Sequence, residues 1–404
     1  MLCDARLRVE IEQAQPLVSS VRSICYFNAE RDDGEAVLES LMQEASPDFD
    51  NVRTAATDTC LLGFTSGTTG VPKATMHFHR DVMAACACWP RHVLRANADD
   101  VFIGSPPMAF TFGLGGQVLF PLSIGASVAL LERPSAPQLV EAIEQFGATV
   151  LFTAPTSYRT MLAHGERLRA SRLRKCVSAG EALNASTREA WKEATGIEII
   201  DGLGSTEMLH IFISHREDEA RAGATGKAVP GYRAHVVDDD GNEVPPGTPG
   251  RLAVQGPTGC RYLNDERQTK YVHDGWNMTG DTYVMDADGY FIYQARTDDM
   301  IISAGYNIAA PEVEDALMAH PDVAECAVIG VPDAERGQIV KAFVVLKGGV
   351  KGDVKGDDAT VRQLQDFVKQ TVAPYKYPRA IQFVASLPRT ATGKLQRFKL
   401  QGLS

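Results

Sequence analysis

The stretch with the most chemical content is a run of hydroxyl-bearing residues and glycines that ends at a lysine. Residues 65–73 read TSGTTGVPK, and the residues of interest in this run are Thr65, Ser66, Gly67, Thr68, Thr69, Gly70 and Lys73. Glycines let a backbone approach a ligand closely, and exposed N–H groups together with hydroxyls donate hydrogen bonds to anions. The run therefore predicts a loop that folds around the phosphates of a nucleotide, with the lysine supplying positive charge.

This loop differs from a phosphate loop of the Walker A type. In that type the lysine directly follows the last glycine, and a Ser or Thr directly follows the lysine. Here a Val-Pro dipeptide separates Gly70 from Lys73, and Ala74 comes next. The spacing excludes the P-loop nucleoside triphosphatases. What remains is a glycine-rich loop of another class.

Two later stretches offer a metal ligand and an acceptor for ribose. In DGLGSTEM, Thr206 and Glu207 follow a buried strand, where a carboxylate can hold Mg²⁺ against phosphate oxygens. In NMTGDTYVMD, Asp281 follows a glycine and can accept hydrogen bonds from ribose hydroxyls. Each stretch taken singly is equally compatible with an ordinary turn.

Two further stretches lie toward the C-terminus. YQARTDDMIISAGYNIAAPEVE contains Arg296, a pair of aspartates and Gly305, and PRTATGKLQRFKL places Lys394 directly after a glycine. Taken alone, the first is equally compatible with a domain linker and the second with a solvated tail. Only the order of all five stretches favours a single nucleotide site.

The elements that must position these residues begin with alternating strands and helices. Strands are expected at 148–155, 175–180 and 197–200, with helices at 156–168 and 186–196 between them. We expect the second helix to open with a capping box of Ser186 and Glu189 and to end at Gly196. Strands separated by helices predict an α/β fold with a mainly parallel sheet flanked by helices.

Two changes in the pattern of expected strands and helices along the chain predict the domain organisation. Asp-Gly turns within AHVVDDDGNEV (234–244) and YVMDADGYFIY (283–293) predict two antiparallel hairpins, with a strand at RLAVQG (251–256) between them. From residue 299 a helix, two apolar strands, a second helix and a last strand predict a small α+β domain. The expected divisions are an α/β part at 1–224, a β-rich subdomain at 225–297 and a C-terminal domain at 299–404.

Composition removes several classes of function. The 404 residues carry a net charge of −11, which argues against a nucleic-acid surface because neutralising phosphates requires an excess of Lys and Arg. No apolar run approaches the ~20 residues that span a bilayer. The eight cysteines form no CxxC pair, and His77 and His79 have no further ligands at zinc-like spacing. We expect a cytoplasmic protein.

The motifs and their order resemble the acyl-adenylating (AMP-binding) superfamily, which includes acyl-CoA synthetases, firefly luciferase and the adenylation domains of peptide synthetases. The resemblance rests on TSGTTGVPK, GSTE, TGD, AR-x-DD and PRT-x-TGK, and it covers almost the whole chain. SAGEALN, DGLGSTEMLHIF and DDMIISAGYNIAAPEVE are most similar to benzoate-type aryl-CoA ligases. PPMAFTFGLGG at 106–116 is similar to the 2-aminobenzoate members.

The resemblance implies that ATP, Mg²⁺ and an aromatic acid give an aryl-adenylate and pyrophosphate. Residues 65–73 would then close over the β- and γ-phosphates, and Thr206 would contact the α-phosphate. Glu207 would hold the metal, while Asp281 and Arg296 would bind the ribose. Lys394 would reach both the α-phosphate and the attacking carboxylate, because two anions that must meet need a cation between them.

The resemblance also implies a second step, in which coenzyme A takes the acyl group. The C-terminal domain is mobile in this family, and Asp298 occupies the position of its hinge. Rotation about that hinge would bring Gly305 to the thiol path, where the absence of a side chain leaves room for the pantetheine arm.

The acid pocket is implied by position alone. The residues expected to surround the aromatic ring are Phe110, Phe112, Ala179, Gly180, Gly204, His210 and Ile211. An ortho amino group would need an acceptor, which could be His210 or the hydroxyl of Thr111. A hydrogen-bonded structural role is the alternative for His210.

Three alternatives stay open from the sequence. Only 64 residues precede Thr65, fewer than in typical family members, so we expect a shortened member of the family. An enzyme that loads a carrier protein would carry the same motifs as a CoA ligase. A remnant that binds nucleotide without catalysis would carry them too.

Overall fold

The computed structural model describes residues 1–28, 37–65, 73–132, 134–296, 300–304, 306–333, 335–347, 358–389 and 395–402, with only the backbone for Asn307 and Phe398. The chain divides into two compact units, Met1–Ala55 and Ala56–Ser404. In the first unit, β1 (Leu2–Asp4) pairs in parallel with β2 (Cys25–Phe27), accompanied by α1 (Arg8–Ala14) and α2 (Leu38–Glu44). Within the described residues, no helix has both the length and the apolar character that crossing a bilayer requires.

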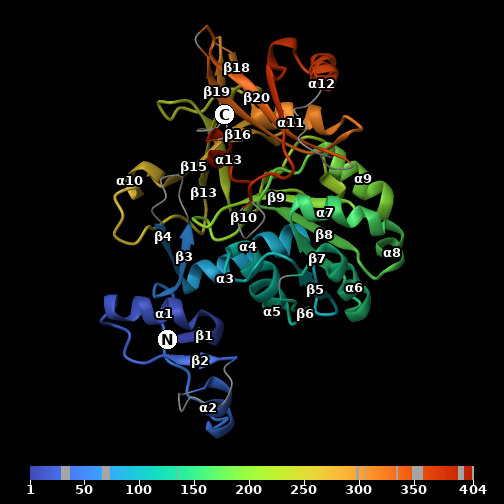
Figure 1. The fold of residues 1–404 in the computed structure, drawn as a ribbon. Coiled ribbons are helices and arrows are strands. Elements are labelled where there is room, and N and C mark those ends of the chain that lie inside the picture. Colours follow the sequence, from blue (N-terminus) through green and yellow to red (C-terminus); the bar gives the residue numbers. More distant parts are fainter. Residues whose placement is uncertain are drawn as a thin grey trace. The chain divides into compact units, whose positions relative to one another are not determined.

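A seven-stranded sheet forms the centre of the second unit (Figure 1). Its strands are β5 (Val101–Gly104), β6 (Ser127–Ala129), β7 (Val150–Thr153), β8 (Lys175–Ala179), β9 (Ile199–Gly204), β10 (Ile211–Ser214) and β11 (Lys227–Ala228). The order is β11-β10-β9-β8-β7-β5-β6, and the five strands from β6 to β9 are parallel. The predicted α/β architecture with a mainly parallel sheet is confirmed.

Both faces of this sheet are covered, because neighbouring residues of each strand point to opposite sides. On one face lie α3 (His79–Ala87), the turn η4 (Pro90–Leu94) and α5 (Phe120–Ile124). On the other lie α6 (Ala136–Phe146), α7 (Pro155–Met161), α8 (Gly165–Ala170) and α9 (Ala185–Thr195). Phe102 packs into the first core and Ile103 into the second, each fully buried. Burying such a side chain stabilises the fold by about 1.5–3 kcal/mol.

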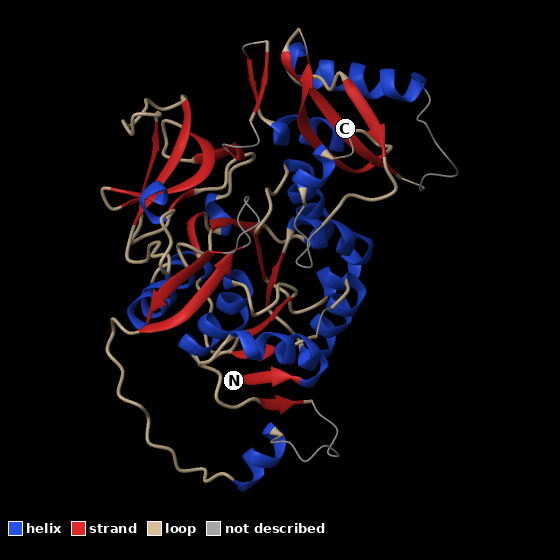
Figure 2. Ribbon diagram, turned by 60° about the vertical axis from the view of Figure 1, so that its left-hand side comes forward, coloured by secondary structure: helices blue, strands red, loops and turns tan. Residues whose placement is uncertain are grey.

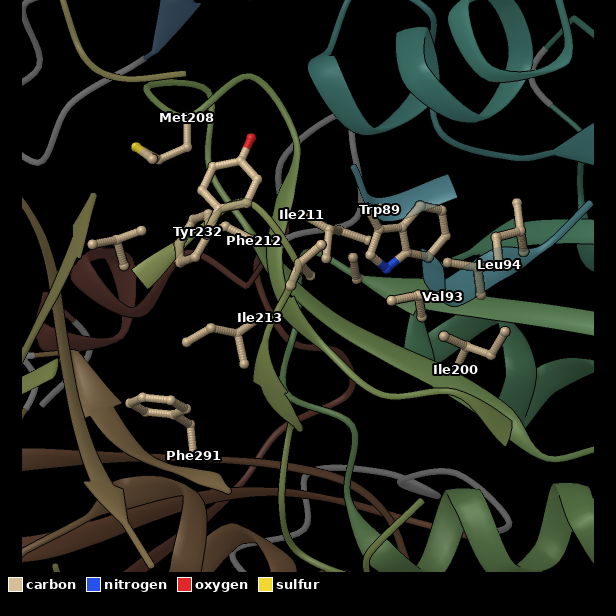
Figure 3. Packing of buried hydrophobic residues seen from close by; sticks show 14 of the residues in the cluster. Trp89, Val93, Leu94, Ile200, Met208, Ile211, Phe212, Ile213, Tyr232 and Phe291 are labelled. Atoms are coloured by element: carbon tan, nitrogen blue, oxygen red, sulfur yellow. The ribbon is translucent and has the colours of Figure 1, made fainter. Parts of the chain in front are cut away.

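Figure 3 shows part of the first core, in which Trp89 lies against Ile211, and Tyr232 lies beside Met208. The contributing residues come from η4, from β9 and β10, and from the sheet that follows. This core therefore joins the seven-stranded sheet to the second sheet, and Met208 of the loop between β9 and β10 packs into it.

The structure corrects two details of the predicted helices. Helix α9 begins at Ala185, where the side chain of Asn184 accepts a hydrogen bond from the Thr187 N–H at 3.0 Å, so the capping box at Ser186 was wrong. Asn184 has the extended backbone that an N-cap needs, and it precedes the predicted cap by two residues. The predicted end at Gly196 is confirmed by its left-handed φ of +80°.

The helix expected over 156–168 is interrupted by a 3-10 turn, Leu162–His164, so α7 and α8 are separate helices. A Cβ on Gly165 would lie 2.8 Å from the Cβ of Ala194. The break lets α8 approach α9 at that glycine.

A second sheet contains β12 (Arg233–Val237), β13 (Pro249–Gln255), β14 (Val272–His273), β15 (Trp276–Met285) and β16 (Phe291–Arg296). The short helix α10 (Gln268–Tyr271) precedes β14. The hairpin predicted at 283–293 is confirmed, and Gly289 takes the left-handed φ of +80° in its turn. The turn predicted at 234–244 forms, with a bridge between Val237 and Glu243 and a hydrogen bond from the Val244 N–H to the Val236 carbonyl oxygen at 2.9 Å, but the residues after it do not extend into a second strand.

The C-terminal sheet has the order β18-β17-β20-β19, with β21 parallel to β20. Figure 2 shows strands and helices mixed in the region around the C-terminus. Its elements are β17 (Ile301–Ser303), β18 (Tyr306–Ile308), α11 (Ala310–Met318), β19 (Val323–Asp333), β20 (Gly337–Leu346), α12 (Asp358–Thr371), β21 (Ala380–Phe383) and α13 (Arg397–Gln401). Leu317, Val344 and Leu364 are fully buried in its core. An α+β region of strands and helices thus follows the second sheet.

Candidate active site

Two antiparallel strands carry the predicted phosphate loop. β3 (Thr59–Thr65) and β4 (Lys73–Phe78) pair along their length, and their last pair joins Thr65 to Lys73. The residues between them, which include the predicted Ser66, Gly67, Thr68, Thr69 and Gly70, lie outside the described residues. The Thr65 hydroxyl oxygen is buried and has no hydrogen-bond partner within the described part of the chain. The described strands on either side of these residues are therefore paired up to Thr65 and Lys73.

Lys73 lies beside Glu207, although Lys73 belongs to the β3–β4 pair and Glu207 to a loop of the seven-stranded sheet. The Lys73 Nζ is 3.7 Å from the Glu207 Oε1, and both side chains are largely buried. Glu207 and Thr206 lie in the loop between β9 and β10, at the carboxyl end of a parallel strand, as the sequence predicted. Tertiary structure thus brings the predicted metal ligand to the end of the predicted phosphate loop.

Tyr262 links these two charged groups, and the sequence analysis did not single it out. Its hydroxyl accepts a hydrogen bond from the Lys73 Nζ at 2.8 Å and donates one to the Glu207 Oε1 at 2.7 Å. The ammonium also lies 4.6 Å from the centre of the Tyr262 ring. Burial, followed by the charge of Glu207, raises the pKa of the phenol well above its usual range. No local motif marks Tyr262, so its role follows from contacts alone.

His77 on β4 fixes the backbone at Thr206 through a hydrogen bond. Its Nε2 lies 2.7 Å from the Thr206 carbonyl oxygen, and because a carbonyl only accepts, the Nε2–H donates. The Nδ1 faces the Asp81 carboxylate at 3.9 Å. Burial lowers the pKa of His77, although the bond to Thr206 and the charge of Asp81 oppose it. A neutral, fully buried imidazole therefore positions the backbone next to Glu207.

Gly63 on β3 permits the close approach of Thr206. A Cβ at Gly63 would lie 2.7 Å from the Thr206 Cγ2, closer than real Cβ contacts allow. The glycine thus lets the side chain of Thr206 lie directly over the strand that leads into the phosphate loop.

The predicted ribose-binding residues lie side by side. Asp281 on β15 is the register partner of Arg296 on β16, and their side chains form an ion pair of 3.5 Å. The neighbouring Gly280 has φ +77°, and a Cβ there would lie 3.1 Å from Arg296 Nη2. Burial, and then the charges of Glu207 and Asp281, raise the pKa of the Tyr271 phenol well above its usual range. A carboxylate and a guanidinium are therefore presented side by side on this hairpin.

His210, three residues after Glu207, lies in a cage of aromatic rings. Its ring centre is 4.5 Å from that of Phe120, 5.8 Å from Trp89 and 5.9 Å from Phe112. Phe152 completes the cage at 5.6 Å from Phe112. Trp89 directly precedes η4, and the other three rings come from α4 (Thr111–Leu114), α5 and β7.

The imidazole of His210 has no hydrogen-bond partner among the described residues, in contrast to the structural alternative raised by the sequence. Burial lowers the pKa of His210 to about 3, and the nearby backbone of Phe112 only partly opposes that shift. The ring is therefore neutral at pH 7, with one donor and one acceptor left to use.

Glycines let the helical segment after Phe110 approach this histidine. A Cβ on Gly115 would lie 2.3 Å from His210 Cδ2, and one on Gly116 would lie 2.4 Å from Phe152 Cδ1. Gly115 and Gly116 of PPMAFTFGLGG therefore allow this segment to pack against His210 and Phe152, where a side chain would clash.

The remaining predicted pocket residues are placed as follows. Gly204 is the register partner of Ile211, and a Cβ on it would lie 2.8 Å from the His210 backbone. Ala179 ends β8, and Gly180 follows it with φ +89°. The structure thus gathers Gly204, His210 and Ile211 with Phe112, whereas the side chain of Phe110 is 46% exposed.

The chain on either side of Lys394 is paired, although Lys394 itself lies outside the described residues, as do Asp298 and Gly305. Arg389 bridges to Leu395, and the Gln396 N–H donates to the Pro388 carbonyl oxygen at 2.9 Å. The Arg389 guanidinium also reaches Glu181 at 3.3 Å. This segment therefore contacts the chain just after the predicted pocket glycine.

Comparisons with known proteins agree with this geometry. Residues 2–262 match the family described as AMP-binding enzyme, and residues 312–394 match the AMP-binding enzyme C-terminal domain. The chain is 38% identical over 413 residues to a benzoate–CoA ligase of Thauera aromatica, a match that covers 99% of this chain and 78% of that protein. It is 34% identical over 410 residues to the mitochondrial acyl-coenzyme A synthetase ACSM4 of Rattus norvegicus, covering 97% and 70%.

Solved structures give the same picture. The anthranilate CoA ligase AuaEII in complex with anthranoyl-AMP superposes with a TM-score of 0.92 at 37% identity, covering 100% of this chain and 77% of that one. A benzoate CoA ligase from Burkholderia xenovorans LB400 superposes with a TM-score of 0.87 at 34% identity, covering 99% and 79%.

Proposed function

The chain belongs to the AMP-binding enzyme family, and we propose that within this family it is an aryl-CoA ligase. Family and relatives together make the protein an AMP-forming acid–thiol ligase that uses ATP and CoA. The finer proposal concerns the acid, which we infer to be benzoate or 2-aminobenzoate.

One observation carries this proposal, namely the two-sided loop between β9 and β10. Thr206 and Glu207 face Lys73 and Tyr262, while His210 enters the aromatic cage. We propose that the acid binds beside His210 at the edge of this cage, next to phosphates held on the other side of the same loop. Such closeness is what a reaction between a carboxylate and a nucleotide requires.

In the first half-reaction, a carboxylate oxygen of the acid forms a bond to the α-phosphorus of ATP. The bond from that phosphorus to the oxygen bridging to the β-phosphate breaks, and pyrophosphate leaves with the electron pair. Residues 65–73 would hold the β- and γ-phosphates, and Thr206 would contact the α-phosphate. Lys394 would lie between the two anions and offset their repulsion.

The nucleotide would be oriented by its sugar and by its metal. Asp281 and Arg296 would accept from and donate to the ribose hydroxyls. Glu207 would hold Mg²⁺, since one carboxylate plus phosphate oxygens is the donor set that this ion favours. Mg²⁺, when bound, supplies positive charge that neutralises the leaving group.

In the second half-reaction, the thiol sulfur of CoA forms a bond to the acyl carbon and AMP leaves. We propose that this step uses the region 299–404 after a rotation at Asp298, which brings Gly305 to the thiol path. The divisions at 1–224 and 225–297 and a cytoplasmic location are parts of the same proposal.

The cage supports an aromatic acid more than a flexible one. Its walls are flat rings and glycines, which suit a thin, rigid substrate. The neutral imidazole of His210 has an acceptor nitrogen available for an ortho N–H, which favours 2-aminobenzoate; the Thr111 hydroxyl is the second candidate acceptor. The match to ACSM4 keeps a straight-chain acyl acid as the competing substrate.

A pyrophosphate-release assay tests the proposal. The acids are benzoate, 2-aminobenzoate, the hydroxybenzoates and hexanoate, each with ATP, Mg²⁺ and CoA. We expect release with an aromatic acid to exceed release with hexanoate at least tenfold, and His210→Phe to lower the preference for 2-aminobenzoate over benzoate. A preference for hexanoate would overturn the aromatic assignment.

Two other outcomes identify the remaining alternatives. Thioester formation with a phosphopantetheinyl carrier protein in place of free CoA would assign the protein to carrier loading. Calorimetric binding of ATP without pyrophosphate release from any acid would assign it to nucleotide binding without catalysis.

A further inference from the structure

We propose that Tyr262 is a positioning residue, which holds Lys73 and Glu207 apart so that each stays available to the metal–nucleotide. The inference rests on the proposed function for the identity of the ligand. Its evidence is the chain of contacts that runs from Lys73 through the phenol to the carboxylate.

The direction of both hydrogen bonds is determined by the chemistry of the groups. A carboxylate cannot donate and an ammonium cannot accept, so the only proton of the Tyr262 hydroxyl is directed at Glu207. The Lys73 ammonium then donates to the same oxygen, at 2.8 Å. The direct distance from Lys73 to Glu207 stays at 3.7 Å, too long for a hydrogen bond.

Tyr262 is itself held rigidly, as a positioning residue must be. It is only 5% exposed, and its backbone N–H donates to the Gln268 Oε1 at 2.7 Å. The adjacent Leu263 N–H donates to the Ala74 carbonyl oxygen at 2.8 Å, so this segment is tied to the strand that begins with Lys73. Tyr271 packs edge-on against the phenol ring at 5.8 Å.

This arrangement occupies one oxygen of Glu207 and keeps its ion pair with Lys73 at 3.7 Å, short of a direct hydrogen bond. Without the hydroxyl, Lys73 and Glu207 can close to a direct contact, in which each neutralises the other. Both the attraction of Lys73 for phosphate and that of Glu207 for a cation would then fall. The phenol therefore preserves two opposite charges in one largely buried site.

The test compares Tyr262→Phe with a matched control, Tyr232→Phe. Tyr232 is another buried tyrosine of the second unit, and its hydroxyl bonds to the Thr258 Oγ1 at 2.8 Å (Figure 3 shows its side chain in the core). Isothermal calorimetry measures the Kd for ATP with and without Mg²⁺, and thermal unfolding measures stability. We expect Tyr262→Phe to raise the Kd for ATP with Mg²⁺ about tenfold, the scale of one hydrogen bond to a charged group. We expect Tyr232→Phe to change it by less than about twofold.

In a Lys73→Met background, Tyr262→Phe should have a much smaller effect on ATP binding, since the charge that it restrains is gone. An unchanged Kd, or equal losses in the two tyrosine variants, would overturn the positioning role. An unaltered protein that binds ATP yet releases no pyrophosphate would contradict only the ligase assignment, whereas one that binds no ATP would overturn both.

Discussion

Asp281 and Arg296 lie directly opposite each other on β15 and β16, and their side chains form an ion pair of 3.5 Å. The ladder starts at the Gly289 turn, and a one-residue register shift between Tyr283 and Thr282 brings Asp281 opposite Arg296. Because Arg296 is 44% exposed at its side chain, the pair adds only ~0–1 kcal/mol to stability. We therefore propose that the pair serves to present an acceptor and a donor to a ligand.

The first prediction concerns this pair. Asp281→Ala should raise the Kd for ATP about tenfold, because a carboxylate that accepts from ribose hydroxyls is lost. It should also remove any preference for ATP over 2′-deoxy-ATP and 3′-deoxy-ATP in calorimetry. Asp288→Ala is the control, since Asp288, in the turn between β15 and β16, forms an exposed ion pair with Arg221. A preference for the ribonucleotide that survives Asp281→Ala would contradict the ribose assignment.

A second prediction separates the half-reactions through Lys394. Lys394→Ala should lower the rate of adenylate formation by on the order of a hundredfold or more, the scale of removing one electrostatic stabiliser of a transition state. Thioester formation from supplied aryl-adenylate should stay largely intact. Rapid-quench assays of each step provide the measurement, and equal loss of both steps would refute this role.

The third prediction is that a change at Gly305 impairs thioester formation and spares adenylate formation, the reverse of the effect expected for Lys394→Ala. Gly305→Leu should obstruct the pantetheine path and lower thioester formation at least tenfold, while pyrophosphate release in the absence of CoA continues. Gly402→Ala is a control, because a Cβ at Gly402 meets nothing closer than 3.7 Å. A loss of adenylate formation in Gly305→Leu would show that the glycine lies elsewhere in the reaction.

The fourth prediction concerns pH and His210. The folded protein keeps this imidazole neutral down to about pH 3, whereas the unfolded chain binds a proton below about 6.5. The unfolded state therefore binds more protons between these values, so this contribution to stability is full above pH 6.5 and is lost as the pH falls toward 3.

In His210→Phe this contribution disappears, because phenylalanine cannot titrate. The free energy of unfolding of the original protein minus that of the variant should fall by up to about 1.4 kcal/mol per pH unit below pH 6.5. Urea titrations at pH 7, 6 and 5 provide the measurement, and the subtraction cancels other groups such as Asp201, whose pKa burial raises to about 7. A difference that stays constant with pH would contradict the buried neutral state.

The fifth prediction tests the contact between β3 and Thr206. Gly63→Ala should displace the Thr206 side chain, since the new Cβ would lie 2.7 Å from its Cγ2. A shift of about 1 Å can cost on the order of a hundredfold in rate, so we expect pyrophosphate release to fall between tenfold and a hundredfold. Thermal unfolding should change little, and unaltered release would show that Thr206 tolerates the displacement.

Sequence by itself determined the features that depend on short-range physics. Alternating apolar runs and helical stretches specified the α/β class, and the Asp-Gly turn before Tyr290 specified the β15–β16 hairpin. Gly196 ended its helix where a left-handed residue was expected. The motifs were also sufficient to identify the family, because their order along the chain can be read without any contact.

The sequence did not show which of two nearby residues caps a helix, or how far a turn extends into a hairpin. Ser186 has the right type and spacing for an N-cap, yet Asn184 takes that place two residues earlier. The Asp-Gly turn after Val237 forms, but the chain beyond it makes one bridge, to Glu243, and no second strand. How far a permitted cap or turn is used depends on packing that the neighbouring residues alone do not reveal.

Only the tertiary structure decided which side chains share a site. Tyr262 is 189 residues from Lys73 along the chain, and nothing around it differs from an ordinary buried tyrosine. Trp89, Phe120 and Phe152 likewise have the composition of a core until the fold places them around an unpaired imidazole. Propensity and turn chemistry act over a few residues, whereas a site is set by distances between strands, and those exist only after the chain has packed.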